Sequence, residues 1–295
     1  MKIAITGASG RLGYRFFEYF SSNGHEAIGT VMKHASDKKG MVQVDLTDRE
    51  KTTSFISESR PDAVIHTAAL TDVDFCETNQ EAAFRQNVLA TRNVLDGCKK
   101  AGSAIIFIST SFVFGRGPKA FSEDDSREPV NYYGITKMKA EDEVSSSDLD
   151  FLIIRTDQPY YWVKSWQKDN HVTKILKKLG AGEEYSDLTD WYNNPTFLPD
   201  IINATQKLMA KDKHGVYNIV GPDYVSRYDW SLKIADIFGK NKDILIPITS
   251  DSLALPAARP NANVSNKKAE LETGIKFSGI EEGLSLMKAA SSSAL

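Results

Sequence analysis

The first half of the chain alternates between short apolar runs and longer stretches with helical spacing. Residues 104–108 form an apolar run without a polar face, which is typical of a parallel strand covered on both sides. Helical spacing falls between such runs, near residues 48–59 and 79–101. Strands that alternate with helices predict a doubly wound α/β fold with a parallel sheet. The apolar runs predict strands within residues 2–6, 25–31, 41–44, 61–66 and 104–108.

A glycine-rich turn joins the first predicted strand to the first predicted helix. Residues 7–13 read Gly-Ala-Ser-Gly-Arg-Leu-Gly, and apolar side chains then recur at helical spacing. Glycine allows a tight turn and a close backbone approach, and a helix N-terminus offers free N–H groups and a positive dipole end to a pyrophosphate. We therefore expect a Rossmann-type dinucleotide-binding turn rather than an ordinary glycine-rich loop. Its expected contacts are Gly7, Ser9, Gly10, Arg11, Leu12 and Gly13.

The end of the second predicted strand indicates which dinucleotide would bind. A site that prefers NAD usually places an acid there, to hold the ribose 2′-hydroxyl. Residues 29–34 contain no acid, and Arg11 and Lys33 would meet a 2′-phosphate with positive charge. The sequence therefore favours NADP(H), with NAD(H) still possible. A solvated loop is an equally simple interpretation of Lys33 and His34.

Tyr133 and Lys137 are four residues apart, a spacing that stacks two side chains on one face of a helix. A fixed cation nearby favours the phenolate and would lower the pKa of the tyrosine. Such a tyrosine can exchange a proton with a carbonyl or carbinol oxygen near neutral pH. Taken alone, the pair could equally be a solvated tyrosine beside a solvated lysine.

Composition excludes several classes of function. The chain has 295 residues and a net charge of −3, so no broad basic face for nucleic acid is expected. No apolar stretch is long enough for a membrane span and no signal peptide precedes the first strand, so we expect a cytoplasmic protein. Cys76 and Cys98 lack metal-ligand spacing and are expected to be reduced thiols, and no metal site is expected.

The second half has a different pattern. Strand–helix alternation weakens after Arg155, and all four tryptophans lie beyond it. We expect residues 1–155, with returning segments near 190–220, to form the dinucleotide-binding domain. Residues 156–288 would form a smaller C-terminal substrate-binding lobe over the carboxyl edge of the sheet, and residues 289–295 a flexible tail. Aromatic residues such as Trp162 would stack on a sugar or fill the core of this lobe.

With these features, the chain resembles the extended short-chain dehydrogenase/reductases, and among them the dTDP-4-dehydrorhamnose reductase branch. The resemblance extends from the glycine turn to about Lys288. Apart from the glycine turn, Tyr133 and Lys137, it rests on residues 68–74, 87–93, 109–114, 154–156, 194–196 and 259–260.

The resemblance implies an NADPH-dependent reductase that acts on a 4-keto group of a nucleotide-linked deoxysugar, in polysaccharide biosynthesis. Thr110 would hydrogen-bond the substrate carbonyl, Tyr133 would donate the proton, and Lys137 would lower the tyrosine pKa and hold the nicotinamide ribose. A homodimer would be common for this superfamily. Further implied cofactor contacts are Asp45, Leu46, Thr67, Ala68, Ala69 and Asn87. Implied substrate contacts are Thr71, Asp72, Ser111, Phe112, Arg155, Trp162 and Arg259.

The chain departs from the pattern of this branch on the substrate side. Ser111 and Phe112 stand where the branch has aspartate and tyrosine, and residues 157–162 differ from its usual Ser-Trp-Val-Tyr. The sugar is therefore open, and so is the activity. Two alternatives remain: a sugar-nucleotide epimerase of the same superfamily, and an NADP-binding regulatory subunit like the β subunit of methionine adenosyltransferase. A dehydratase would need an acid pair directly after Thr110, which this chain lacks.

Overall fold

A central seven-stranded sheet organises the computed structural model, which describes residues 1–32, 40–117 and 119–291. Every pairing within this sheet is parallel, in the order β11-β6-β5-β4-β1-β2-β3. Its strands are β1 (Lys2–Thr6), β2 (Glu26–Val31), β3 (Met41–Gln43), β4 (Ala63–His66), β5 (Ala104–Thr110), β6 (Phe151–Thr156) and β11 (Gly215–Asn218). The doubly wound parallel sheet expected from the sequence is confirmed.

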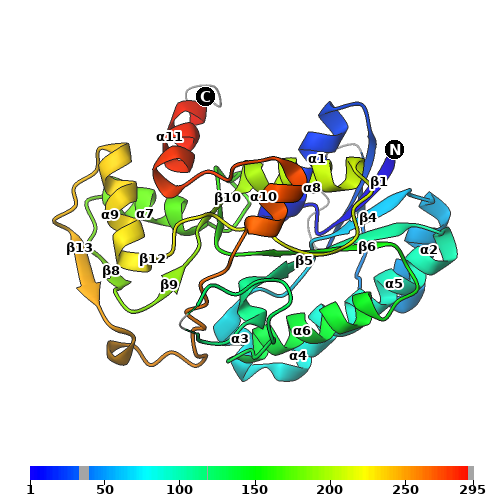
Figure 1. Cartoon of the computed structure of the whole chain (residues 1–295), viewed down its shortest axis with the longest axis horizontal. Coiled ribbons are helices and arrows are strands. Elements are labelled where there is room, and N and C mark those ends of the chain that lie inside the picture. The colour runs from blue at the N-terminus through cyan, green and yellow to red at the C-terminus, as the bar shows by residue number, and fades with distance from the viewer. Residues whose placement is uncertain (33–39, 118, 292–295) are drawn as a thin grey trace.

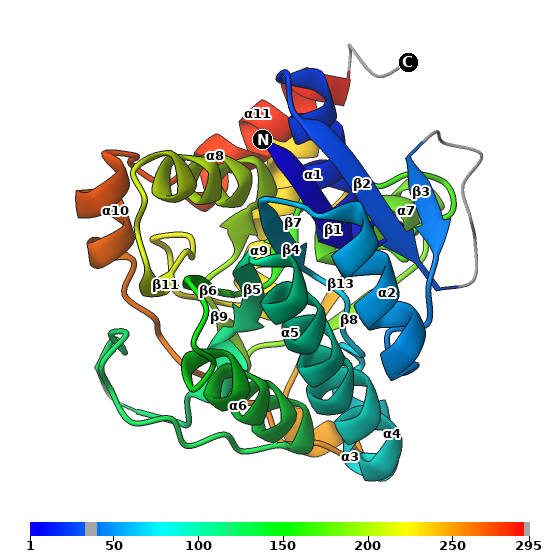
Figure 2. The same cartoon turned by 90° about the vertical axis from the view of Figure 1, so that its right-hand side faces the viewer.

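Helices cover both faces of the sheet, so the central strands β1, β4, β5 and β6 are buried from both sides (Figures 1 and 2). One apolar core lies between the sheet and α1 (Arg11–Ser22), α8 (Leu198–Ala210) and α10 (Lys267–Thr273). The other lies beneath α2 (Arg49–Ser59), α5 (Ala90–Ala101) and α6 (Tyr132–Ser145). The shorter helices of this part are α3 (Val73–Thr78), α4 (Gln80–Phe84), the π-helical η1 (Arg85–Leu89) and the 3₁₀ turn η2 (Ser111–Val113).

A smaller lobe stands at one end of the molecule (Figure 1). It has its own core, built around the buried side chains of Tyr160 and Trp230. Its helices are α7 (His171–Gly180), α9 (Arg227–Phe238), α11 (Ile280–Ser291) and the 3₁₀ turn η3 (Ser250–Ser252). Its short strands pair as β7 (Pro159–Tyr160) with β10 (Thr196–Phe197), β8 (Tyr185–Leu188) with β13 (Leu245–Ile248), and β9 (Tyr192–Asn193) with β12 (Val225–Ser226).

The chain crosses between the two parts more than once. After β6 it enters the small lobe, and residues 198–218 then return to the sheet as α8 and β11. At the C-terminal end, α11 continues through Ser291, so the first residues of the expected tail 289–295 are helical instead. Residues 292–295 lie outside the described part of the chain. Among the described residues, no helix has the length and apolar character needed to cross a membrane.

Candidate active site

A cavity of about 470 Å³ lies beyond the carboxyl ends of the strands and joins the predicted cofactor and catalytic residues. Its wall is formed by the β1–α1 turn, the residues after β4, the end of β5 and one face of α6. The segment after β6 closes it from the side of the small lobe. The predicted site residues on this wall are Ser9, Gly10, Arg11, Leu12, Gly13, Thr67, Ala69, Thr71, Thr110, Phe112, Tyr133 and Lys137.

The glycine turn presents an anion-binding helix end to this cavity. Gly7 has a φ of +66°, and a Cβ there would lie 2.9 Å from the backbone of Ala68. Gly10 begins α1 without a capping side chain, and the first amide bonded within the helix is that of Tyr14. The N–H groups of residues 11–13 therefore lie at the cavity end of α1, and a pyrophosphate fits this position.

An adjoining hollow of about 50 Å³ continues the site toward β2 and contains Gly7, Asp45, Leu46 and Ala68. The side chain of Asp45 accepts hydrogen bonds from the N–H and the hydroxyl of Thr47, which fixes this turn. Val31, the last residue of β2, and the following Met32 line the hollow, so neither of these two positions carries a carboxylate. Lys33, predicted to meet a 2′-phosphate, lies outside the described residues.

The catalytic pair lies on one face of α6, as the spacing predicted. Asn131 caps this helix through a 2.9 Å bond to the N–H of Gly134, and both Tyr133 and Lys137 are buried on the cavity wall. The Tyr133 hydroxyl lies beside the side chain of Thr110, near enough for Thr110 to lower the pKa of the phenol. Two hydroxyls therefore meet at one point of the cavity, where a single oxygen atom could contact both.

The expected lowering of the Tyr133 pKa by Lys137 is wrong for this geometry. Lys137 Nζ donates a 2.8 Å bond to the carbonyl of Ile108 and lies 3.9 Å from the ring centroid of Phe107. Burial raises the pKa of Tyr133, and the nearby Thr110 offsets this only in part. A phenol with a raised pKa holds its proton at neutral pH, which suits a proton donor.

Burial also lowers the pKa of Lys137 from its ordinary value of 10.5 to about 7, with Glu141 opposing the shift. Between these pH values the unfolded chain binds one more proton than the folded protein, so this lysine makes stability rise with pH. We expect the unfolding free energy of the wild type minus that of Lys137→Met to increase from pH 7 to pH 9, at most by about 1.4 kcal/mol per unit. Urea titrations at fixed pH values measure it; a flat difference would contradict the shift.

The predicted substrate residues do not all reach the cavity. Thr71 and Phe112 line it, and the Phe112 ring meets that of Tyr133 edge-on at 5.6 Å. Ser111 is buried beside them, near enough to the carboxylate of Asp157 to lower its pKa. Asp72 instead caps α3, accepting a bond from the N–H of Phe75, and is not part of the wall.

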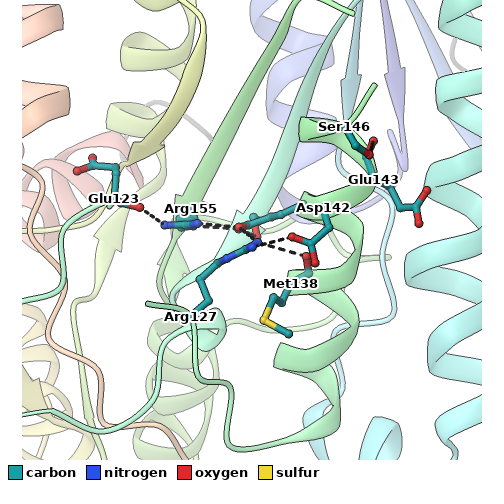
Figure 3. A network of polar contacts seen from close by, with 9 residues as sticks. Glu123, Arg127, Met138, Asp142, Glu143, Ser146 and Arg155 are labelled. Atoms are coloured by element: carbon teal, nitrogen blue, oxygen red, sulfur yellow. Dashed lines mark hydrogen bonds and ion pairs between the residues drawn. The ribbon is translucent and has the colours of Figure 1, made fainter. Parts of the chain in front are cut away.

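Arg155 is placed away from the cavity and is held by a buried carboxylate. Its Nε and Nη2 bond the two oxygens of Glu141 at 3.0 and 2.7 Å, and its Nη1 bonds the carbonyl of Glu123. Figure 3 shows Arg155 and Arg127 both reaching toward α6, where Arg127 also bonds Asp142. The guanidinium is fully engaged, so we correct the predicted substrate contact to a structural role.

Three further predicted contacts are also structural. Trp162 donates to the carbonyl of Met287 and packs on Phe238 within the small lobe, because its segment turns away from the cavity. Arg259 makes two bonds to Asp74 on α3. Asn87 lies within η1 and uses both ends of its amide to tie the backbone of Leu70 to the hydroxyl of Thr136.

A segment that sequence reasoning missed crosses the glycine turn. Gln167 Nε2 donates to the carbonyls of Ser9 and Gly10 at 3.1 and 3.0 Å, and Arg11 donates back to the carbonyl of Asp169 at 3.0 Å. The ring of Trp166 meets that of Tyr14 at 5.6 Å. Residues 166–169 show no helical or strand periodicity. The only feature of the sequence that could have indicated their role is that they follow β6, a strand whose carboxyl end lies at the site.

Gly13 tests the glycine turn directly. A Cβ at this position would lie 2.4 Å from the carbonyl oxygen of Gly7 and 2.5 Å from the hydroxyl of Thr67. Gly13→Ala should therefore displace the turn and weaken NADPH binding by about tenfold or more, measured by fluorescence titration. Gly180→Ala is the matched control, because a Cβ there meets nothing within 4 Å. Equal affinity in the two variants would show that the turn does not hold the cofactor.

Comparisons with known proteins show the family and the fold. The family model of the RmlD substrate binding domain matches residues 1–292. The chain belongs to this family. It is 29% identical to the methionine adenosyltransferase 2 subunit beta of Rattus norvegicus, over 91% of this chain and 81% of that protein. It is 28% identical to a dTDP-4-dehydrorhamnose reductase of Mycolicibacterium smegmatis, over 93% of this chain and 80% of that one.

Among solved structures, a dTDP-4-dehydrorhamnose reductase from Bacillus anthracis in complex with NADP superposes with a TM-score of 0.88. The match covers 98% of each chain at 24% identity. At that identity the likeness shows a shared fold. The family and the fold predicted from the glycine turn, Tyr133 and Lys137 are thereby confirmed.

Proposed function

We propose that this protein is an NADPH-dependent reductase of a 4-keto group on a nucleotide-linked deoxysugar. One observation carries the proposal: the paired hydroxyls of Thr110 and Tyr133 and the uncapped start of α1 open into the same cavity. A nicotinamide cofactor laid along this cavity would have its pyrophosphate at the glycine turn and its reactive end beside Tyr133.

The residues of the chain would divide the reaction as follows. Thr110 and Tyr133 hold the substrate carbonyl oxygen between their hydroxyls, and Tyr133 passes its proton to that oxygen as negative charge develops there. Lys137, held by the carbonyl of Ile108, lies one helical turn from Tyr133 and would contact the nicotinamide ribose. The bound cofactor supplies the hydride.

NADP(H) is the favoured cofactor, with NAD(H) as the alternative. The turn formed by residues 7–13 would hold the pyrophosphate, and Asp45, Leu46 and Ala68 would enclose the adenosine. Support for NADP comes from the absence of an acid at Val31 and Met32, within the described end of β2. The same fold holds NADP in the Bacillus anthracis protein.

The direct test is oxidation of NADPH, followed by its absorbance, with a panel of nucleotide 4-ketosugars that includes dTDP-4-dehydrorhamnose. We expect turnover with at least one of them and slower turnover with NADH. NADPH without sugar is the blank. No turnover with any sugar of the panel would contradict the proposal.

A second candidate is a regulatory subunit that binds NADP. The similarity to methionine adenosyltransferase 2 subunit beta over 91% of the chain favours it, together with two unusual residues, Asp157 on the cavity wall and Ser111 buried beside it. Co-purification with a methionine adenosyltransferase catalytic subunit, combined with no reductase activity, would support this alternative. NAD⁺ that stays bound through purification would instead favour an epimerase. Homodimerisation and a cytoplasmic location stay predictions.

A further inference from the structure

Asp157 is a buried carboxylate on the cavity wall to which the reaction described above gives no role. It follows the last residue of β6, and its exposed fraction is 3%. In the sheet, Thr156 is the register partner of Thr110 on β5. Neighbouring strands are roughly 4.8 Å apart, so Thr156 lies about one strand spacing from Thr110, and Asp157 is the next residue.

Only one oxygen of this carboxylate is engaged by the described part of the protein. Oδ2 accepts a 2.8 Å bond from the N–H of Asn194. The side chain of Ser111 and the backbone N–H of Gln158 lie near enough to lower the pKa of the carboxylate. Oδ1 is buried and has no hydrogen-bond partner among the described residues, and neither has the buried hydroxyl oxygen of Thr156. Both residues line the cavity. Buried polar atoms without partners are costly, so two on one wall point to a ligand that supplies the missing bond.

The wall around Asp157 is held rigidly. Gln158 has a φ of +40°, a left-handed conformation that is unfavourable for a residue with a side chain. Arg227 fixes it by a 3.0 Å bond to its Oε1, and the same guanidinium contacts His171. The positive charge of Arg227 also acts on Asp157. Because Arg227 already supplies a positive charge, a neutral hydroxyl is a better hydrogen-bond donor to Oδ1 than an ammonium group.

We propose that Asp157 Oδ1, with the hydroxyl of Thr156, forms a subsite that recognises a sugar hydroxyl next to the reacting carbonyl. This inference rests on the proposed function, which places a 4-keto group at Thr110 and Tyr133. The ring carbon beside a 4-keto group that carries a hydroxyl in a 6-deoxyhexose is C3. The two residues therefore select substrates with a free C3 hydroxyl. Burial raises the pKa of Asp157 to about 6, so above that pH it is mainly the acceptor that such a hydroxyl needs.

The test uses the full-length protein with NADP⁺ bound, and calorimetric titration with dTDP-rhamnose and with its 3-deoxy analogue. The wild type should bind dTDP-rhamnose about tenfold or more tightly than the analogue. In Asp157→Asn the amide oxygen must face the N–H of Asn194, so an NH₂ donor replaces the acceptor at the position of Oδ1. This variant should weaken the preference for dTDP-rhamnose, because a neutral amide donor replaces the charged acceptor of the hydroxyl, while it keeps its affinity for the analogue and for NADP⁺.

Thr156→Val is the second variant, because valine matches threonine in shape and removes only the hydroxyl. It should reduce the same preference and leave NADP⁺ affinity unchanged. The proposal is overturned if the wild type binds both ligands equally or binds neither, or if Asp157→Asn weakens both ligands and NADP⁺ alike. Should Asp157→Asn fail to fold, an unchanged preference in Thr156→Val overturns it.

The outcomes separate this subsite from the proposed function. Binding needs no turnover, so a C3-dependent preference in a protein that reduces no 4-ketosugar would uphold the subsite and reject the reductase. If the wild type reduces 4-ketosugars but binds dTDP-rhamnose and its 3-deoxy analogue equally, the reductase is upheld and the subsite is rejected.

Discussion

Replacement of Tyr133 by phenylalanine is expected to lower kcat for 4-ketosugar reduction by about 10²- to 10⁴-fold. The substitution removes the proton donor and half of the hydroxyl pair with Thr110, and it leaves the ring in its contact with Phe112. The cofactor turn lies on another element, so the affinity for NADPH should stay within a factor of about two. Steady-state kinetics and a fluorescence titration with NADPH give the two numbers.

Tyr132→Phe provides the control for this variant. Tyr132 is the neighbouring residue on α6, and its bond to Glu77 uses the backbone N–H, which the substitution leaves in place. Its kcat should remain close to that of the wild type. If Tyr133→Phe retained most of the activity, the proton would come from another group. In a regulatory subunit, Tyr133→Phe would leave partner binding intact.

Glu141→Ala is expected to destabilise the protein by about 3–5 kcal/mol, because it leaves a buried guanidinium without its partner. Glu141 is 1% exposed and accepts bonds from Arg155, Arg127 and the hydroxyl of Ser109. These groups come from β6, from the loop before α6 and from β5, so one carboxylate joins three parts of the fold. Urea unfolding followed by circular dichroism measures the loss.

Glu143→Ala is the matched control on the same helix. Its carboxylate pairs with Arg92 at the surface, and exposed pairs contribute at most about 1 kcal/mol. A double variant, Glu141→Leu with Arg155→Met, should recover much of the stability that Glu141→Ala loses, because apolar pairs can replace buried ion pairs. A loss below 1 kcal/mol for Glu141→Ala would show that Arg155 finds other partners.

The sequence predicted well the features that depend on local spacing. The apolar run at residues 104–108 marked β5, although the strand continues to Thr110, and the four-residue spacing placed Tyr133 and Lys137 on one helix face. The glycine turn could be predicted equally well, because the strand before it and the helix after it are adjacent to it in the sequence. For such features, nearby residues determine the geometry.

The roles of long side chains could not be predicted in the same way. Lys137 was expected to act on Tyr133, yet its ammonium bonds the carbonyl of Ile108, 29 positions away in the chain. The hydrogen-bond partner of the Trp162 side chain lies 125 positions away in the sequence. Gln167 bonds the carbonyl of Gly10, which is 157 positions away. The packing of the two lobes determines these partners. The spacing of residues along a single sequence does not predict that packing.

The register of β5 and β6 has a consequence for protein engineering. Thr110, Tyr133 and Lys137 all precede β6 in the chain, whereas the wall residues 157–159 and 166–168 follow it. One continuous stretch of the gene therefore encodes the three catalytic residues. The next stretch encodes most of the surface that would contact the sugar. Chimeras that exchange only residues 157–169 between relatives would transfer the substrate preference of one protein to the other. The proton donor would stay within its own sequence.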